Sequence, residues 1–159
     1  MKRCFPWVAV SILLAFAFGS LLLSGCAPKK SSAEEAYKCF VGTWENTEAK
    51  ADQAFGKVVL QPDYIMKLWV GKDSPSPYAA KVAVKKTWVD AEGGLCCQYF
   101  FTFFERYKAR GLGLMRLDKA EKVLELNQKY GKEDDAHPDQ IERQSPGKDW
   151  TLYMIFYRK

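Results

Sequence analysis

The chain has almost no histidine. A single histidine, His137, stands among 159 residues, and no Cys-x-x-Cys pair is present. Because transition metals in proteins are held mainly by clustered His and Cys side chains, this composition argues against a His-rich metal site. Asp134, Asp135 and Asp139 surround His137, but a solvated acidic loop explains them without a metal. We therefore expect no metal and no cofactor.

The sequence also lacks common catalytic motifs. No serine lies in a Gly-x-Ser-x-Gly turn, and His137 has no nucleophile beside it in sequence. The segment Gly111-Leu112-Gly113 is too short for a phosphate-binding loop. We predict that the protein is not an enzyme.

A strong charge of one sign is missing as well. The chain has 24 Lys and Arg residues against 19 Asp and Glu residues, for a formal net charge of +5. The basic residues are spread along the chain and interleaved with acidic ones, so no basic surface for nucleic acid is expected. We predict no nucleic-acid partner.

Only the N-terminus carries a long apolar run. Lys2 and Arg3 precede an apolar segment at 7–23, and small residues follow it. This is the layout of a secretory signal, although the run is only slightly short of a membrane-spanning helix. Both interpretations place the rest of the chain beyond the membrane on a tether.

The end of this segment, Leu23-Ser24-Gly25-Cys26, resembles the lipobox of bacterial lipoproteins. The resemblance implies that residues 1–25 are a signal peptide and that Cys26 carries the lipid, such as palmitate. Two or three acyl chains would anchor the protein stably. Ala27 after the cysteine implies the outer membrane, if the cell has one, and in any case a cell-envelope location.

Two further regions follow the signal. Residues 26–36 are predicted to be a lipidated tether, because Ala27 to Ala36 offers few apolar side chains. Residues 37–159 are predicted to form one domain, in keeping with its length.

Short apolar runs separated by turn-rich segments predict eight strands in this domain. They are expected at Phe40–Ala49, Gly56–Gln61, Tyr64–Gly71, Ala79–Trp88, Leu95–Tyr107, Gly111–Asp118, Lys122–Lys129 and Trp150–Arg158. Short turns between them favour antiparallel neighbours, and closing the sheet removes exposed edges. We predict an all-β, eight-stranded antiparallel up-and-down barrel.

The first of these strands contains Gly42-Thr43-Trp44, which resembles the Gly-x-Trp signature of lipocalins. The resemblance implies that Trp44 plugs one end of the barrel and that Arg158, in the last strand, packs over it. It also implies that Gly42, Trp44 and Arg158 are structural residues. The Thr-Asp-Tyr motif of classical lipocalins is absent.

An eight-stranded barrel either fills its interior or holds one small ligand. Aromatic side chains suit both outcomes, because they offer apolar walls and also fill volume. The candidates for a ligand cavity are Trp44, Trp69, Trp88, Tyr99 and Trp150.

The strand beginning at Leu95 is apolar on both faces. Cys97, Tyr99, Phe101 and Phe103 share one face with Leu95, but Phe100 and Phe104 lie on the other. Something should cover the outer face: the long loop at 130–149, the tether, or a partner such as a second copy or an envelope protein.

Three cysteines remain in the predicted domain, Cys39, Cys96 and Cys97. A disulfide between Cys39 and either of the other two is possible in an exported protein, and a free buried cysteine is equally ordinary.

Two functions remain open. The chain is either a lipid-anchored barrel that binds a small apolar or amphipathic ligand, or a filled barrel that acts through its outer surface. The partner in the second case would be an envelope protein, a host component or an enzyme that the barrel inhibits.

Overall fold

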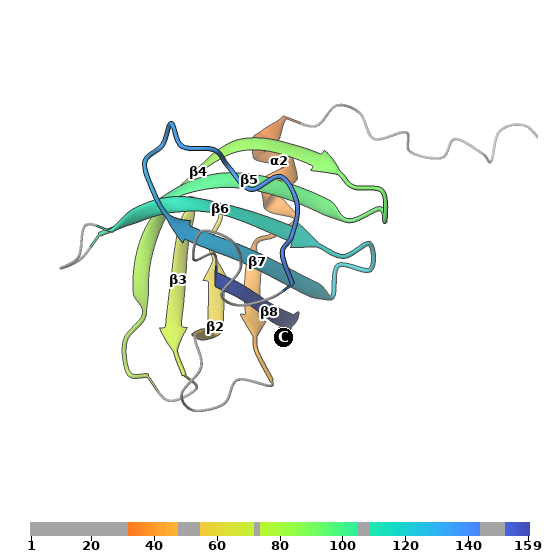
Figure 1. The fold of residues 1–159 in the computed structure, drawn as a ribbon. Helices are drawn as coiled ribbons and strands as arrows, with labels where there is room; N and C mark the ends of the chain where they lie inside the picture. Colours follow the sequence, from red (N-terminus) through yellow and green to blue (C-terminus); the bar gives the residue numbers. More distant parts are fainter. Residues whose placement is uncertain (1–31, 48–54, 72–73, 105–108, 144–151) are drawn as a thin grey trace, which may run out of the picture. The chain divides into compact units, whose positions relative to one another are not determined.

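The computed structural model describes residues 32–47, 55–71, 74–104, 109–143 and 152–159. A short helix, α2, is followed by eight strands that each pair antiparallel with the next, and β8 closes on β1 (Figure 1). The predicted eight-stranded up-and-down barrel is confirmed. The elements are α2 (Ala33–Lys38), β1 (Gly42–Glu45), β2 (Phe55–Leu60), β3 (Ile65–Val70), β4 (Tyr78–Val89), β5 (Leu95–Phe103), β6 (Arg110–Leu117), β7 (Val123–Tyr130) and β8 (Leu152–Arg158).

Helix α2 corrects the predicted end of the tether. Ser32 caps the helix, since its Oγ accepts a hydrogen bond from the Glu35 amide at 3.3 Å. Ala36 and Tyr37 are buried, and the Tyr37 ring stacks on Tyr64 with centroids 4.7 Å apart. Residues 32–36, which the prediction placed in the tether, therefore form part of a helix that packs on the barrel. A helix of six residues is too short to show a helical apolar period in the sequence.

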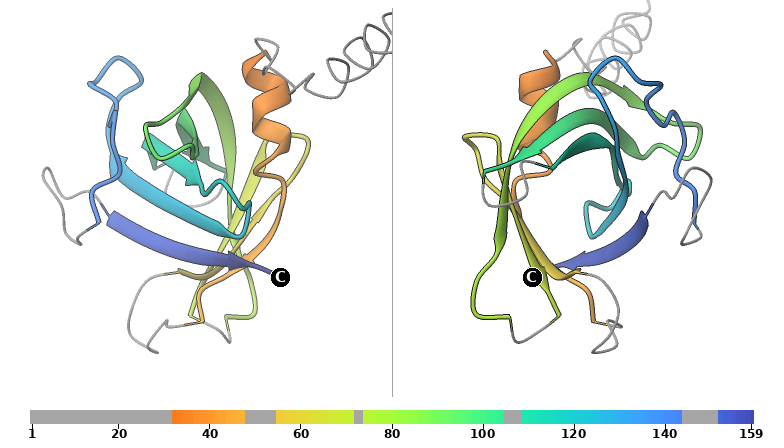
Figure 2. Two further views of the ribbon diagram at one scale, coloured as in Figure 1. Left: turned by 90° about the vertical axis from the view of Figure 1, so that its right-hand side faces the viewer. Right: turned by 60° about the vertical axis from the view of Figure 1, so that its left-hand side comes forward.

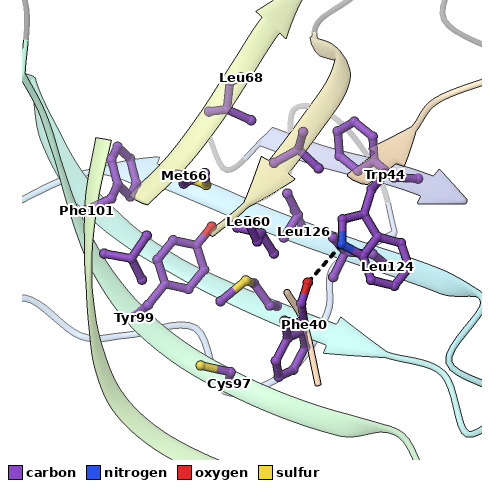
Figure 3. Packing of buried hydrophobic residues seen from close by; sticks show 14 of the residues in the cluster. Phe40, Trp44, Leu60, Met66, Leu68, Cys97, Tyr99, Phe101, Leu124 and Leu126 are labelled. Atoms are coloured by element: carbon purple, nitrogen blue, oxygen red, sulfur yellow. Dashed lines mark hydrogen bonds between the residues drawn. The ribbon is translucent and has the colours of Figure 1, made fainter. Parts of the chain in front are cut away.

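Trp44 fills one end of the barrel, which we name the closed end. Its side chain is fully buried, and Nε1 donates a hydrogen bond to the Phe40 carbonyl oxygen at 2.9 Å (Figure 3). The guanidinium carbon of Arg158 lies 4.6 Å from the centroid of the indole. Gly42 has φ of +149°, a conformation that side chains disfavour, as the chain enters β1. The contact expected between Arg158 and Trp44 is thus present.

Side chains that alternate along the strands fill the interior next to Trp44. Figure 3 shows Tyr99 and Phe101 pointing into this space from β5. The inner cluster includes Val58, Leu60, Met66, Leu68, Ala80, Val82, Cys97, Tyr99, Phe101, Met115, Leu117, Leu124, Leu126, Met154 and Phe156.

A second apolar layer lies outside the barrel. Phe100 and Leu112 face each other across β5 and β6 on the outer side, Leu114 lies two residues further on, and all three are buried. The segment 131–143, which we name the strap, lies against this side of the barrel (Figure 2). Gln98 Nε2 donates to the carbonyl oxygen of Pro138 in the strap at 2.8 Å.

The strap is also joined to β7. Asn127 Nδ2 donates to the Glu142 carbonyl oxygen at 3.0 Å, and the Glu142 amide donates to Asn127 Oδ1 at 2.7 Å. The long loop, which was one of the three covers considered for the outer face of β5, therefore lies against this face. Its position agrees with β5 being apolar on both sides.

Candidate functional site

The end of the barrel opposite Trp44, which we name the open end, contains a cavity. β2, β4, β6 and β8 start there, and the other four strands end there. The cavity has a volume of about 330 Å³. It is lined by Phe55, Phe101, Phe103, Gln128, Lys129, Tyr130 and Leu152.

The walls of the cavity are mainly aromatic. Phe101 and Phe103 follow each other on the inner face of β5, with ring centroids 5.5 Å apart and planes at 75°. Gly111 lies opposite Phe101 on β6, where a Cβ atom would come within 2.7 Å of the Phe101 ring. The missing side chain at Gly111 therefore leaves room for the aromatic wall.

The side chain of Gln128 brings a polar group to the cavity. Gln128 is only 4% exposed, and its Nε2 donates to the Tyr99 hydroxyl oxygen at 2.7 Å and to Met66 Sδ at 3.5 Å. Burial raises the pKa of Tyr99 well above its ordinary value, although the bond from Gln128 opposes the shift. The Tyr99 hydroxyl therefore stays protonated and neutral at every physiological pH.

Formal charges are kept off the inner face in the described part of the chain. Gln128 is the buried polar residue that reaches the cavity, whereas buried Arg116, Glu125 and Asn127 occupy outward positions in the strand register. Lys129 pairs with Leu112, which also points outward. Burial lowers the pKa of His137 in the strap, and the nearby charges of Lys85 and Lys129 lower it further. Lys129 nevertheless contributes to the lining of the cavity.

Apolar side chains surround the mouth of the cavity. Leu152 is 39% exposed and Tyr130 is 73% exposed. Among the described residues, the large exposed apolar side chains lie at the open end with the exception of Val89. They are Val70, Tyr78, Phe104, Tyr130 and Leu152, which we name the rim.

The structure places the predicted cavity residues in different positions. Tyr99 is buried in the interior, where it bonds to the cavity-lining Gln128 but does not itself line the cavity, and Trp44 is inside the barrel at the closed end. Trp69 and Trp88 do not line the interior, so this part of the prediction is wrong. Trp150 lies outside the described residues.

The two misplaced tryptophans lie on the outer face for different reasons. In β3, Met66 and Leu68 point inward, so Trp69 points outward, where Lys57 Nζ lies 5.0 Å from its ring. In β4 a bulge between Val84 and Lys86 shifts the alternation by one residue. Trp88 therefore pairs with outward-facing Cys96, and Lys86 Nζ lies 5.2 Å from its ring.

Two of the cavity walls could have been found from the sequence. Phe101 and Phe103 share the alternation of Tyr99 and were expected on its face. Gln128 and Leu152 carried no such signal, because a glutamine near a strand end normally faces solvent.

A second cluster of polar side chains lies on the outer face, between β5–β8 and the strap. Arg116 bonds to Asp90 at 2.5 Å, to Glu92 at 2.6 Å and to Glu125 at 2.9 Å. Arg143 of the strap also bonds to Glu125, with Nε at 2.7 Å from Oε1. The charges in this cluster satisfy each other, which indicates a structural role.

The cysteines are present as free thiols, with Cys96 and Cys97 buried and Cys39 partly exposed. The possible disulfide is therefore not formed in the structure. Burial raises the pKa of Cys96 to about 11, and the charge of Asp90 adds to this effect. A thiol with so high a pKa is a poor nucleophile at neutral pH.

Two further searches concern only the parts of the chain that the structure describes. Within them, no three metal-binding side chains gather in one place, and no helix has the length and apolar character needed to cross a bilayer. The predicted lipidation site Cys26 and the signal segment lie outside these residues.

Comparisons with protein-family models, with curated proteins and with solved structures found no match to this chain.

Proposed function

We propose that the protein is a lipid-anchored barrel of the cell envelope that binds a small apolar or amphipathic ligand in its open end and does not act as an enzyme. The observation that carries this proposal is the cavity of about 330 Å³ with aromatic walls and an apolar rim. Concave, mostly apolar sites with a few polar groups are the usual form of small-molecule sites.

The position of the cavity supports binding from one side only. Trp44 fills the closed end of the barrel, so a ligand would enter past the rim. Burial of apolar surface supplies about 25 cal/mol per Å², and the exposed rim would offer an apolar ligand its first contacts.

The envelope location rests on the sequence. The segment Leu23-Ser24-Gly25-Cys26 supports signal cleavage and acylation of Cys26. Each buried CH₂ group of an acyl chain contributes about 0.8 kcal/mol, so two or three chains anchor a protein stably.

The binding proposal can be tested with a neutral fluorophore. The full-length chain in lipid nanodiscs is titrated with aminoanthracene, and the signal of protein-free nanodiscs is subtracted. We expect saturable enhancement of its fluorescence. Leu152→Trp adds a ring at the mouth and should weaken binding several-fold.

A matched control adds the same ring elsewhere. Val89 is exposed at the closed end, so Val89→Trp should leave the affinity unchanged. Absence of saturable binding, or equal affinity of both variants and the unmodified protein, contradicts a ligand site in this cavity.

The alternative is a module that binds an envelope protein, a host component or an enzyme, with no ligand inside. The rim favours it, since clustered exposed apolar side chains often mark protein interfaces. The outer face of β5 no longer does, because the strap covers it. Under this alternative, Tyr130→Ser would abolish partner binding while aminoanthracene fails to bind at all.

A further inference from the structure

We propose that the outer face of β2, β3 and β4, which we name the basic face, lies on a bilayer surface that exposes anionic lipid headgroups. This inference rests on the membrane anchor of the proposed function and does not depend on the cavity. Its starting point is the charge of the three strands, which together contain five lysines and no Asp or Glu residue. The lysines are Lys57, Lys67, Lys81, Lys85 and Lys86.

The barrel brings together lysines that lie far apart in the sequence. β2, β3 and β4 are neighbours in the sheet (Figure 1). Lys67 pairs with Ala79, two residues before Lys81, and Lys57 pairs with Trp69, two residues after Lys67. Side chains two residues apart on a strand share a face, so these lysines point outward together. Because acidic residues lie between them in the sequence, the pattern of charge along the chain did not predict this face.

Most of these lysines have no acidic partner. Lys85 forms a salt bridge with Glu133 of the strap. Glu45 of β1 lies opposite Lys57, but its carboxylate bonds to Lys159 Nζ at 3.0 Å. Within the described part of the chain, no salt bridge involves Lys57, Lys67, Lys81 or Lys86.

The usual reasons for surface lysines do not explain this arrangement. Protein surfaces normally intersperse charges of both signs, and lysines on a strand often protect the exposed edge of an open sheet. These strands lie inside a closed barrel, where each one pairs with a neighbour on both sides. A face with four lysines outside any salt bridge therefore indicates an anionic partner, because such a partner supplies the missing negative charge.

Two tryptophans lie among the lysines. Lys57 Nζ is 5.0 Å from the ring of Trp69, and Lys86 Nζ is 5.2 Å from the ring of Trp88. Tryptophan is enriched where proteins meet the membrane–water interface, because its ring is apolar and its N–H group is polar. A lysine beside such a ring can contact a lipid phosphate while the ring contacts the layer below. This combination favours a lipid surface over other anionic partners.

The position of α2 agrees with contact to the bilayer that would carry the anchor. α2 packs against β4, and Ser32 caps the start of this helix. Cys26 lies six positions before Ser32, which corresponds to at most about 20 Å of extended chain. Acyl chains at Cys26 would therefore keep β4 close to the bilayer. Attraction between lysines and anionic lipids acts over about 8 Å at physiological ionic strength.

The test measures the accessibility of the lysines themselves. The full-length chain is placed in phosphatidylcholine nanodiscs with or without anionic phosphatidylglycerol, and a water-soluble ester acetylates the exposed amines. Mass spectrometry gives the labelling rate of each lysine. We expect phosphatidylglycerol to slow the labelling of Lys67, Lys81 and Lys86 by about fivefold and to leave Lys132 of the strap unchanged. High salt should remove the difference, because it screens the attraction.

A pair of double variants tests whether the charge of the basic face is responsible. K67E/K81E reverses two charges on this face, so the labelling of Lys57 and Lys86 in anionic discs should return to the rate seen in neutral discs. K119E/K132E makes the same change of net charge at two exposed lysines elsewhere and should keep the slow labelling. Circular dichroism checks that both variants fold.

Several results would overturn the proposal. They are equal labelling of the basic face in both kinds of disc, slow labelling that persists in K67E/K81E, and loss of slow labelling in K119E/K132E. If soluble heparin slows the labelling and phosphatidylglycerol does not, the partner is an acidic polysaccharide and the proposal is again wrong.

The same discs test the anchor separately. A chain that associates with anionic discs but not with neutral ones would contradict the anchor and support the basic face. Association with neither kind of disc would contradict both. None of these results depends on a ligand in the cavity, so ligand binding is tested independently.

Discussion

Gly113 lies directly beneath the ring of Tyr99 in the barrel interior. The two residues pair across β5 and β6, and a Cβ atom at position 113 would stand 2.2 Å from Tyr99 Cζ and 2.5 Å from its hydroxyl oxygen. The absent side chain therefore allows the tyrosine to lie across the neighbouring strand and to reach Gln128 at 2.7 Å. The position of the Tyr99 ring and its bond to Gln128 depend on this glycine.

Gly113→Ala should destabilise the protein by about 1–3 kcal/mol, because the added methyl group overpacks a buried site. Urea unfolding measures the free energy of unfolding. The effect should be much smaller in a Tyr99→Leu background, where the ring that the methyl group meets has been removed. Equal effects in both backgrounds would show that the methyl group acts through another contact.

Arg158→Ala should reduce stability by about 1–2 kcal/mol, because it removes the cation–π contact with Trp44 and the hydrogen bond from Nη2 to the Cys39 carbonyl oxygen. Lys159→Ala is a neighbouring control. Lys159 makes an exposed ion pair with Glu45, and its loss should cost about 0.5 kcal/mol or less. Similar losses for both variants would argue against a structural role of the Arg158–Trp44 contact.

The free energy of unfolding should fall at acid pH, because Glu125 becomes protonated there. Burial opposes ionisation of Glu125, but hydrogen bonds from Arg143 and Tyr153 and the charges around it outweigh burial and hold its pKa below the ordinary value. A carboxyl group whose pKa is lower in the folded state stabilises the protein above its unfolded pKa of about 4.3. This contribution is lost as the pH falls through the lower, folded pKa.

Glu125→Gln should therefore be destabilising by about 1–3 kcal/mol at pH 7, and the difference from the unmodified protein should shrink below about pH 4. Urea unfolding across this pH range provides the measurement. Glu92→Gln is the control, since Glu92 bonds to the same Arg116 but its side chain is 65% exposed. A gap for Glu125→Gln that does not change with pH would contradict the role of its charge.

Asn127 holds the strap through the two hydrogen bonds to the backbone of Glu142. Asn127→Ala removes both, so amide hydrogen exchange in the strap should accelerate while exchange in β2 and β3 stays unchanged. Asn127→Asp keeps an acceptor for the Glu142 amide and loses the donor, and it should give an intermediate rate. Unchanged exchange in Asn127→Ala would mean that other contacts hold the strap.

The sequence predicted the strands well because turns and apolar runs mark where strands start and end. It also predicted Arg158 over Trp44, on the strength of the resemblance to lipocalins. The inner face was harder to predict. In Leu68-Trp69-Val70 three apolar residues follow each other, and alternation alone does not say which of them points inward.

A bulge and a long segment account for the remaining differences. The bulge between Val84 and Lys86 turns Trp88 outward, and no pattern in the sequence predicts this bulge. The apolar outer face of β5 indicated that something covers it, but which segment does so depends on contacts between distant residues such as Gln98 and Pro138. Gln128 was not predicted as a cavity residue, because no pattern in the sequence links it to Tyr99, its hydrogen-bond partner 29 positions away.

Cys26→Ser tests the anchoring that the lipobox implies. Serine has no thiol to acylate, so in a cell that processes lipoproteins the variant should accumulate as an unprocessed precursor or appear in the soluble envelope fraction. Fractionation with intact-mass measurement distinguishes these results from the unmodified protein, which should lose residues 1–25 and gain the mass of its acyl chains. Cys4→Ser, within the signal segment, is the control and should be processed normally. A different result would support an uncleaved membrane helix at 7–23. In that case both Cys26→Ser and the unmodified protein would stay in the membrane, each with the mass of its full, unacylated chain.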